Sequence, residues 1–278
     1  LTHLSSTENI KINFNSLSSV VDVFSVLQEK YKWGTNLPYM VSGANSLPQK
    51  QVMEWVSNRF YSYNSIIRAL NNKSQGVIDN ERLEYFKINK NYDKILIIGG
   101  GASVEKSFNF IESFLIKNSD TLIIHSSSRN ASLFSKLKND QIFCLLGNEG
   151  YRMEKVFENN LPIASKCILP PYPRLMGTYI PIKMKDRSYE LDKIVFKSID
   201  DVSHTSIASQ TAINFCPKEI YVVGYDGYSN SISKKDQELF IENNSLFHEL
   251  KDLGFNLISL TKTDYSNLTS GSIYSEIV

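Results

Sequence analysis

The sequence contains few cysteines, no long apolar run and almost no net charge. Its three cysteines, Cys144, Cys167 and Cys216, stand in apolar neighbourhoods, and no two have the close spacing of a metal site. We therefore expect buried, reduced thiols and a cytoplasmic protein. Lys and Arg number 30 and Asp and Glu number 29, so charge gives no reason to expect nucleic acid or an anionic membrane as a partner. No apolar run approaches the roughly 20 residues of a membrane-spanning helix.

Metal-ligand patterns and targeting signals are also missing from the sequence. The four histidines, His3, His125, His204 and His248, are scattered without an HxH or HExxH pattern, so no metal site is predicted in this chain. The N-terminus has no basic region followed by an apolar stretch, so no export signal is visible. Because the sequence begins with Leu1 and not with an initiator methionine, we expect a fragment of a longer polypeptide.

Hydrophobic spacing divides the 278 residues into two regions. Residues 1–90 carry apolar stripes at helical spacing and no alternating strand pattern, which predicts a small helical segment. Residues 71–93 are polar and mark the boundary. From 91 to 278 strand and helix patterns alternate, which predicts an α/β, Rossmann-like domain with a mostly parallel sheet and helices on both faces. Its strands are expected at 94–98, 121–125, 141–146, 165–169, 219–223 and 256–260, and its helices at 104–116, 131–137, 206–215 and 234–253.

One stretch, KILIIGGGASVE from Lys94 to Glu105, organises the predicted domain. An unbroken apolar run suits a strand that is buried on both faces, and Gly99, Gly100 and Gly101 then allow a tight turn with accessible backbone amides. Ser103 can begin a helix, so strand, turn and helix N-terminus together favour a phosphate site. The alternative is a tight turn that binds no ligand.

The pattern departs from that of NAD-binding proteins. Val104 stands where the third glycine of GxGxxG should be, and the second strand is followed by His125 and three serines in place of an acidic residue. Both departures argue against a dinucleotide and leave other nucleotides open.

The segment YKWGTNLPYMVSG at 31–43, with the following 45–56, resembles the region after the barrel in 4-hydroxy-2-oxovalerate aldolase-like proteins of the HMG-CoA-lyase-like superfamily. The resemblance covers about residues 20–70. It implies an upstream (β/α)8 barrel that carries the catalytic residues and a divalent metal. Since the Arg-Asp and His-x-His pairs of that barrel are not in this chain, it implies a parent lyase polypeptide and no aldolase activity here.

Two further blocks resemble another group of proteins. GGGASV at 99–104 is similar to the GxGPSL loop of MptE-like and motility-associated-factor glycosyltransferases and of bacterial sialyltransferases, with Ala102 in place of Pro. Thr205, Ser206 and KEIYVVGYDGY at 218–228 are similar to a second block of the same families. The resemblance implies a bacterial domain that binds a nucleotide or nucleotide-sugar, with a CMP-sugar favoured.

These patterns predict a set of nucleotide-binding residues. Amides of the turn would hold the phosphate, the start of the 206–215 helix would hold a second anionic group or the ribose, and an acidic residue in the last block would accept from a sugar hydroxyl or simply belong to a turn. The loop after the second strand matches the place where sialyltransferases put a cytidine-contacting Asn. The nominated residues are Gly99, Gly100, Gly101, Ser103, Ser126, Ser127, Asn130, Thr205, Ser206 and Asp226.

The sequence gives fewer signs of a catalytic reaction than of a nucleotide-binding site. The segment where sialyltransferases carry a catalytic His, 229–235, has none here, and His248 lies in an apolar helix pattern that indicates packing. His204 stands beside the nominated site and could act as an acid or base, or contact phosphate. Arg174 and Arg187, in an expected irregular insert at 174–203, could clamp a diphosphate or be solvated loop charges.

Three functions remain open from the sequence. The first is the C-terminal region of an aldolase-like polypeptide whose Rossmann-like domain binds a nucleotide or nucleotide-sugar. The second is an active glycosyltransferase, and the third is a structural appendage without a ligand. The unpaired helical stripes of residues 1–90 also suggest burial against another domain or a second copy of the chain.

Overall fold

The computed structural model describes residues 76–79, 82–172, 174, 178–198, 202–228 and 233–277. The helices expected within residues 1–75, and with them the aldolase-like segment, lie outside the described residues. None of the helices in the described ranges is both long enough and apolar enough to cross a bilayer.

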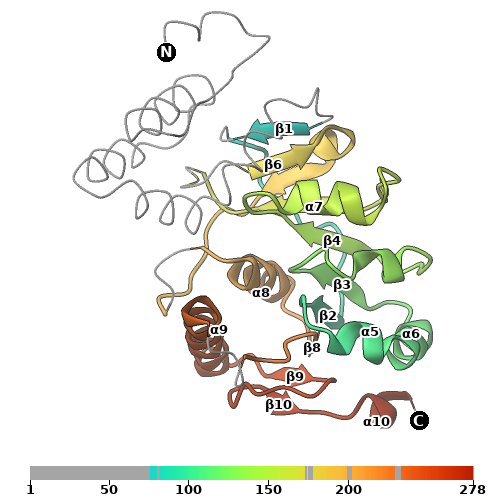
Figure 1. Ribbon diagram of the computed structural model, residues 1–278, viewed down its shortest axis with the longest axis vertical. Helices are drawn as coiled ribbons and strands as arrows, with labels where there is room; N and C mark the ends of the chain where they lie inside the picture. The colour runs from blue at the N-terminus through green and yellow to red at the C-terminus, as the bar shows by residue number, and fades with distance from the viewer. Residues whose placement is uncertain are drawn as a thin grey trace, which may run out of the picture.

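The described chain builds an eight-stranded sheet covered by helices on both faces (Figure 1). Every strand pair in this sheet is parallel. The predicted Rossmann-like α/β fold is thereby confirmed. In spatial order the strands are β10 (Thr269–Ser270), β9 (Leu257–Ser259), β8 (Glu219–Val223), β2 (Lys94–Ile98), β3 (Leu122–His125), β4 (Gln141–Cys144), β5 (Lys166–Leu169) and β7 (Ser188–Glu190).

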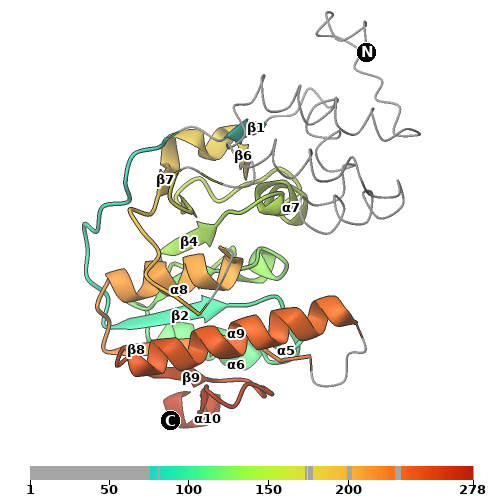
Figure 2. The same ribbon diagram turned by 90° about the vertical axis from the view of Figure 1, so that its left-hand side faces the viewer.

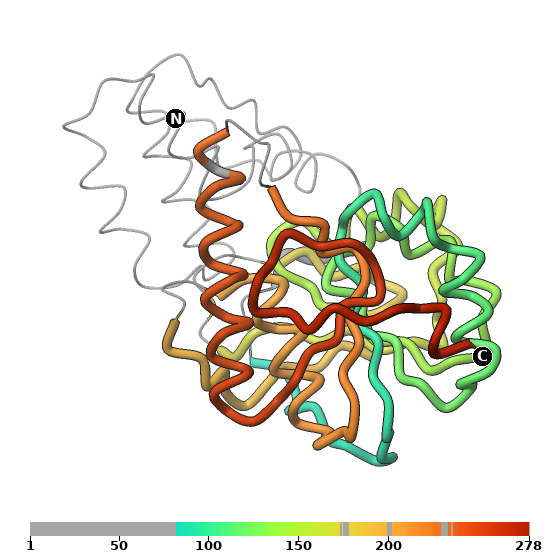
Figure 3. The backbone as a smooth tube through the Cα atoms, turned by 90° about the horizontal axis from the view of Figure 1, so that it is seen from below, coloured from blue at the N-terminus to red at the C-terminus, as the bar shows by residue number. Residues whose placement is uncertain are grey.

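Alternate side chains of β2 enter two different hydrophobic cores, because successive residues of a strand point to opposite faces. Ile95 and Ile97 pack in the core under α8 (His204–Asn214) and α9 (Lys234–Asp252). Leu96 and Ile98 pack in the core under α5 (Ser103–Lys106), α6 (Phe108–Lys117) and α10 (Ile273–Ile277). Seen from below, α9 and the green α5–α6 segment lie on opposite sides of the strands (Figure 3). Burial of β2 on both faces explains why its sequence is an unbroken apolar run.

The strand order reverses at β2. From β2 the chain adds β3, β4, β5 and β7 outward in one direction, then returns through α8 and adds β8 and β9 on the other side of β2 (Figure 2). In open parallel sheets such a switch point leaves a crevice beyond the carboxyl ends of the two central strands, and ligands bind there. A ligand site is therefore expected at the loops after β2 and β8.

Several local predictions are wrong. The insert predicted to be irregular contains β6 (Thr178–Pro181), the 3-10 helix η2 (Ile182–Arg187) and β7. Strand β1 (Gly76–Asp79) lies in the region predicted to be helical and pairs antiparallel with β6. The helix expected at 131–137 is a 3-10 helix, η1 (Ala131–Phe134), and α7 (Glu149–Val156) was not expected.

Two expectations about burial also need correction. Cys144 and Cys167 are buried free thiols as predicted, but Cys216, which follows α8 with a positive φ of 49°, is exposed. His248, which was expected to pack, points to solvent with 64% of its side chain exposed, 3.8 Å from Asp252 Oδ1. Its neighbours Leu246 and Phe247 fill the core from the same helix.

Candidate functional site at the carboxyl edge of the sheet

The turns after β2 and β8 touch each other, and glycine makes this contact feasible. The Gly99 amide donates to the Val223 carbonyl at 2.8 Å, and the Gly101 amide donates to the Gly224 carbonyl at 2.9 Å. A Cβ on Gly99 would overlap the Gly224 carbonyl, and one on Gly101 would lie 2.6 Å from the Asp226 carboxylate. These two glycines are therefore needed for contact between protein loops, and their amides already have acceptors.

Asp226 occupies the start of helix α5. Its Oδ2 accepts from the Ser103 amide at 3.0 Å, and its Oδ1 makes a short hydrogen bond with the Ser103 hydroxyl. A carboxylate thus sits where a phosphate was predicted. Ser103 and Asp226 bind each other, and the phosphate contact expected of Ser103 and the ribose contact expected of Asp226 stay predictions. Helix α5, with only four residues, also has too few aligned peptide units for a strong N-terminal dipole.

Gly100 remains open to the outside of the turn. Within the described residues its amide has no protein acceptor, and its carbonyl accepts from Arg129 Nη1 at 3.0 Å. Asn130 Nδ2 donates to the Gly101 carbonyl at 3.1 Å, so the loop after β3 is tied to the glycine turn. Ser127, half-buried, lies beside Gly100 with its Oγ 3.3 Å from where a Gly100 Cβ would stand. Gly100, Ser127 and Asn130 are thus brought together, as the sequence predicts.

Ser126 and Ser206 have structural partners. The Ser126 hydroxyl donates to the Ile98 carbonyl at 3.0 Å and accepts from Tyr225 at 2.8 Å, fully inside the protein. Ser206 is buried and forms a capping box with Ser203 at the start of α8. Both hydroxyls therefore have roles in fixing the loops, and the ligand contacts predicted for them stay predictions.

Thr205, next to Ser206, is buried and lies near the Tyr225 side chain. Burial raises the pKa of Tyr225 more than Thr205 lowers it, so Tyr225 stays protonated at neutral pH. Thr205 lies at the predicted position at the start of α8, and any contact of this residue with a ligand stays a prediction.

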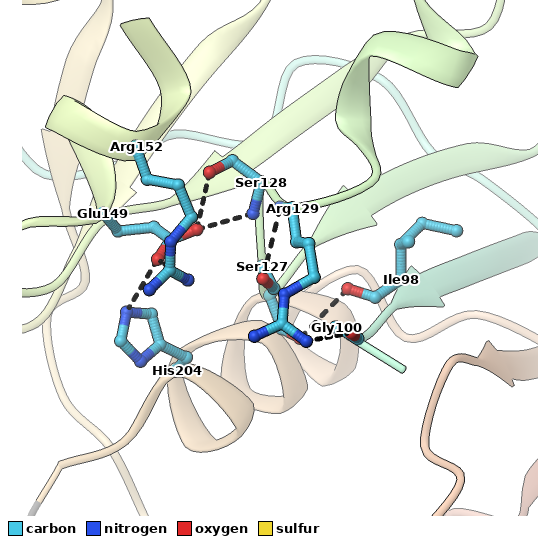
Figure 4. Close-up of polar contacts among 9 residues, drawn as sticks. Ile98, Gly100, Ser127, Ser128, Arg129, Glu149, Arg152 and His204 are labelled. Carbon is cyan, nitrogen blue, oxygen red and sulfur yellow. Dashed lines mark hydrogen bonds and ion pairs between the residues drawn. The ribbon is translucent and has the colours of Figure 1, made fainter. Parts of the chain in front are cut away.

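A cluster around Glu149 was not predicted (Figure 4). Glu149 is buried at the start of α7, and its Oε1 accepts from both the amide and the hydroxyl of Ser128 at 2.6 Å. Its Oε2 accepts from Arg152 Nη1 at 2.8 Å and lies 3.6 Å from His204 Nε2. The sequence did contain a signal for helix α7, namely Gly147-Asn148 after a strand and then a polar and apolar pattern of helical period. Because no helix was predicted there, Glu149 and Arg152 were not considered as site residues.

His204 is held at the N-terminal end of α8, next to this cluster. Desolvation is the main influence and lowers the pKa of its imidazole, while the Glu149 charge raises it, the Arg152 charge lowers it and a hydrogen bond to the Leu146 backbone raises it. The net direction is downward, so the ring is neutral at pH 7. A neutral imidazole is the form that a general base requires.

The two arginines proposed as a diphosphate clamp do not meet. Arg174 follows β5, but its side chain is fully buried, with Nη2 2.6 Å from Glu190 Oε2 and Nε donating to the Pro170 carbonyl at 3.1 Å. Arg187 is exposed and directly precedes β7, so it lies at the amino ends of the parallel strands, on the opposite edge of the sheet. The Arg174 guanidinium is enclosed in a buried ion pair, and Arg187 lies at the other end of the strands, so the structure does not bring the two together. A diphosphate clamp formed by them stays a prediction.

A cavity of about 90 Å³ lies at that opposite edge, lined by residues that include Tyr92, Asp140, Gln141 and Lys166. It is remote from every predicted nucleotide-binding residue. In the part of the chain that the structure describes, no group of three or more His, Cys, Asp or Glu side chains could hold a metal ion.

Comparison with known proteins gives one coarse likeness. No family model matches the chain, and no curated protein matches it either. Among solved structures it is similar to the MAf glycosyltransferase from Magnetospirillum magneticum AMB-1, with 11% sequence identity and a TM-score of 0.47 over 94% of this chain and 48% of that one. The chain thus spans about half the length of that structure. At this level the likeness carries no assignment of ligand or activity, and the Rossmann-like fold rests on the sheet itself.

Proposed function

We propose that the domain from 91 to 278 binds a nucleotide or nucleotide-sugar at the carboxyl edge of its sheet. The observation that supports this most is the convergence of the loops after β2, β3 and β4 with the start of α8, at the carboxyl ends of the strands and beside the switch point of the strand order. Parallel sheets offer ligands backbone and side-chain donors at this edge. A CMP-type ligand is the finer form of the proposal and rests on the sequence resemblance.

The groups that remain available for such a ligand are few. Within the described residues the Gly100 amide has no protein acceptor, and the Asn130 carboxamide oxygen is left after its nitrogen binds the Gly101 carbonyl. The Ser127 hydroxyl beside Gly100 accepts from the Arg129 amide at 3.3 Å and keeps its own O–H as a donor. A hydroxyl, an amide N–H and a carboxamide oxygen can form hydrogen bonds with ribose hydroxyls and with the edges of a base. We therefore assign the nucleoside to the side of the turn formed by Gly100, Ser127 and Asn130.

A thermal-shift screen tests this proposal. CMP, UMP, CMP-sugars and UDP-sugars are added to the full chain, and a rise in melting temperature that saturates with concentration is the expected result, because a ligand that binds only the folded state stabilises it. Ser127→Ala should weaken the shift. Ser113→Ala, which removes a hydroxyl on α6 that donates to the Asn109 carbonyl, is the matched control and should leave it unchanged. No shift with any nucleotide would favour the structural appendage.

A second candidate, an active glycosyltransferase, is favoured by the state of His204. Its lowered pKa keeps the ring neutral near pH 7, as a base that deprotonates an acceptor hydroxyl must be. If this candidate holds, release of CMP from a CMP-sugar should fall strongly in His204→Gln while nucleotide binding persists. Equal release by the variant and the unaltered protein would remove His204 from the reaction.

The remaining part of the proposal concerns the parent polypeptide. We propose that an aldolase-like barrel precedes this region and that the barrel, or a second copy of the chain, covers the apolar stripes predicted in residues 1–90. The resemblance at 31–43 and 45–56 supports this. The upstream coding sequence is the direct test: a (β/α)8 pattern with a His-x-His pair is expected, and its absence would contradict the aldolase origin.

A further inference from the structure

Most of the donors predicted to hold a nucleotide phosphate already have partners within the protein, so the phosphate would need further partners outside the turn. The amides of Gly99, Gly101 and Ser103 each have a protein acceptor. A phosphate at Ser103 would also have to approach the Asp226 carboxylate, and like charges at hydrogen-bond distance repel each other. The phosphate should therefore lie outside the turn, where positive charge is available.

Two arginines supply that charge at the same edge. Arg129 is exposed and Arg152 has 40% of its side chain exposed. Within the described residues each guanidinium makes one hydrogen bond to protein, Arg129 to the Gly100 carbonyl and Arg152 to Glu149. Because a guanidinium has five N–H donors, most donors of both side chains are left for a ligand.

Buried Glu149 links the two arginines. Its Oε1 holds the amide and hydroxyl of Ser128, the residue directly before Arg129, and its Oε2 holds Arg152. In Figure 4 the Arg152 guanidinium lies above His204 and the Arg129 guanidinium lies over Gly100, with Ser127 and Ser128 between the two side chains. The Glu149 carboxylate, which is 2% exposed, thus fixes the backbone next to Arg129 and the side chain of Arg152. Such fixation lowers the entropy cost of binding.

We infer that Arg129 and Arg152 form the phosphate subsite of this edge and bind the phosphate or diphosphate of a nucleotide between them. This inference rests on the proposed nucleotide site. Guanidinium groups match phosphate oxygens with paired, charge-assisted hydrogen bonds, which are stronger than neutral ones. Gly100, which binds Arg129 through its carbonyl, then lies between the phosphate and the nucleoside side of the turn.

The test is calorimetric titration of the full chain with inorganic pyrophosphate, CMP, UMP and the phosphate-free nucleosides cytidine and uridine. Three variants are compared with the unaltered protein. Arg129→Gln removes an exposed charge, and Arg152→Lys keeps a charge beside Glu149 but loses the planar fork, so that the buried carboxylate is not left unpaired. Arg187→Gln is the matched control, because it removes an exposed arginine at the opposite edge of the sheet.

The expected result is a loss of affinity of about tenfold or more for pyrophosphate and the nucleotides in Arg129→Gln and Arg152→Lys, with no change in Arg187→Gln. Weak binding of the nucleosides should be unaffected. If the chain binds CMP or UMP and both variants bind as tightly as the control, the inference is overturned while the nucleotide site stands. If pyrophosphate binds in an arginine-dependent way but no nucleotide does, the subsite stands and the nucleotide proposal fails. Absence of binding to all probes overturns both.

Discussion

His125 should make the folded protein lose stability in mild acid. It is 1% exposed at the end of β3, its ring stacks on Phe143 with centroids 4.5 Å apart, and its Nε2 lies 2.9 Å from Gln141 Oε1. Burial lowers the pKa of this imidazole to about 4, against an ordinary value of 6.5, and the hydrogen bond to Gln141 only partly opposes the effect. At about 1.4 kcal/mol for each pKa unit, this difference corresponds to about 3 kcal/mol.

The direction of the effect follows from proton binding. Between pH 6.5 and 4 the unfolded chain protonates His125 and the folded chain does not, so the free energy of unfolding decreases as the pH falls through this range. Urea denaturation followed by far-ultraviolet circular dichroism at pH 7.5, 6, 5 and 4 measures this decrease. The contribution of neutral His125 to the free energy of unfolding should be fully present above pH 6.5 and should be smaller by about 3 kcal/mol at pH 4.

His125→Phe is the matched variant, because it keeps an aromatic ring against Phe143 and removes the titrating group. Other groups with altered pKa values, such as Glu154 and Asp140, titrate in both proteins and cancel in the comparison. The variant should therefore show a flatter dependence of stability on pH than the unaltered protein. Parallel pH profiles would contradict this prediction, since they would mean that the His125 ring is hydrated in the folded state.

Three further predictions concern the loops at the edges of the sheet. Gly99→Ala should destabilise the fold by about 1–3 kcal/mol, because its Cβ would overlap a backbone carbonyl of the neighbouring loop, whereas Gly100→Ala should cost less in urea denaturation; equal costs would contradict the loop contact. Asp226→Asn should lower stability by about 1–3 kcal/mol through loss of charge-assisted bonds to the start of α5, and an unchanged denaturation midpoint would show that the carboxylate does not hold the turn. Arg174→Gln should lower the free energy of unfolding by about 3–5 kcal/mol, because it leaves the buried Glu190 carboxylate without its ion-pair partner. Arg187→Gln should lower it by about 0.5 kcal/mol or less, and a similarly small loss in both variants would contradict the buried pair.

The sheet was predictable because its strands carry a strong local signal. β2 and β8 are apolar runs bounded by polar residues and glycine, and both were placed at their observed bounds, 94–98 and 219–223. β6 and β7 were missed because their short, mixed sequences have no period of their own, and they depend on partners distant in sequence, such as the pairing of Gly76 with Pro181. Helix α7 was missed although Asn148, a residue type favoured at the N-cap, stands before it. Its buried face includes Glu149 and Glu154, which interrupt the apolar pattern expected of a helix.

The site was only partly predictable for a related reason. Sequence pattern placed Gly100, Ser127 and Asn130 correctly at one edge, because loops after neighbouring parallel strands must meet there. It could not show that Asp226, over 120 residues away in the chain, would supply the anion for the Ser103 amide. Nor could spacing reveal that Arg174 is enclosed, since an exposed and a buried arginine look alike in sequence.

The most direct test of the nucleotide site is chemical-shift mapping by nuclear magnetic resonance of the nitrogen-15-labelled chain during titration with CMP and UMP. We expect shifts that concentrate on the amides of 99–103, 126–130, 149–152 and 204–206, which converge at the carboxyl edge of the sheet. Shifts that concentrate instead around Tyr92, Asp140 and Lys166, at the cavity on the opposite edge, would contradict this expectation, as would an unchanged spectrum at saturating nucleotide.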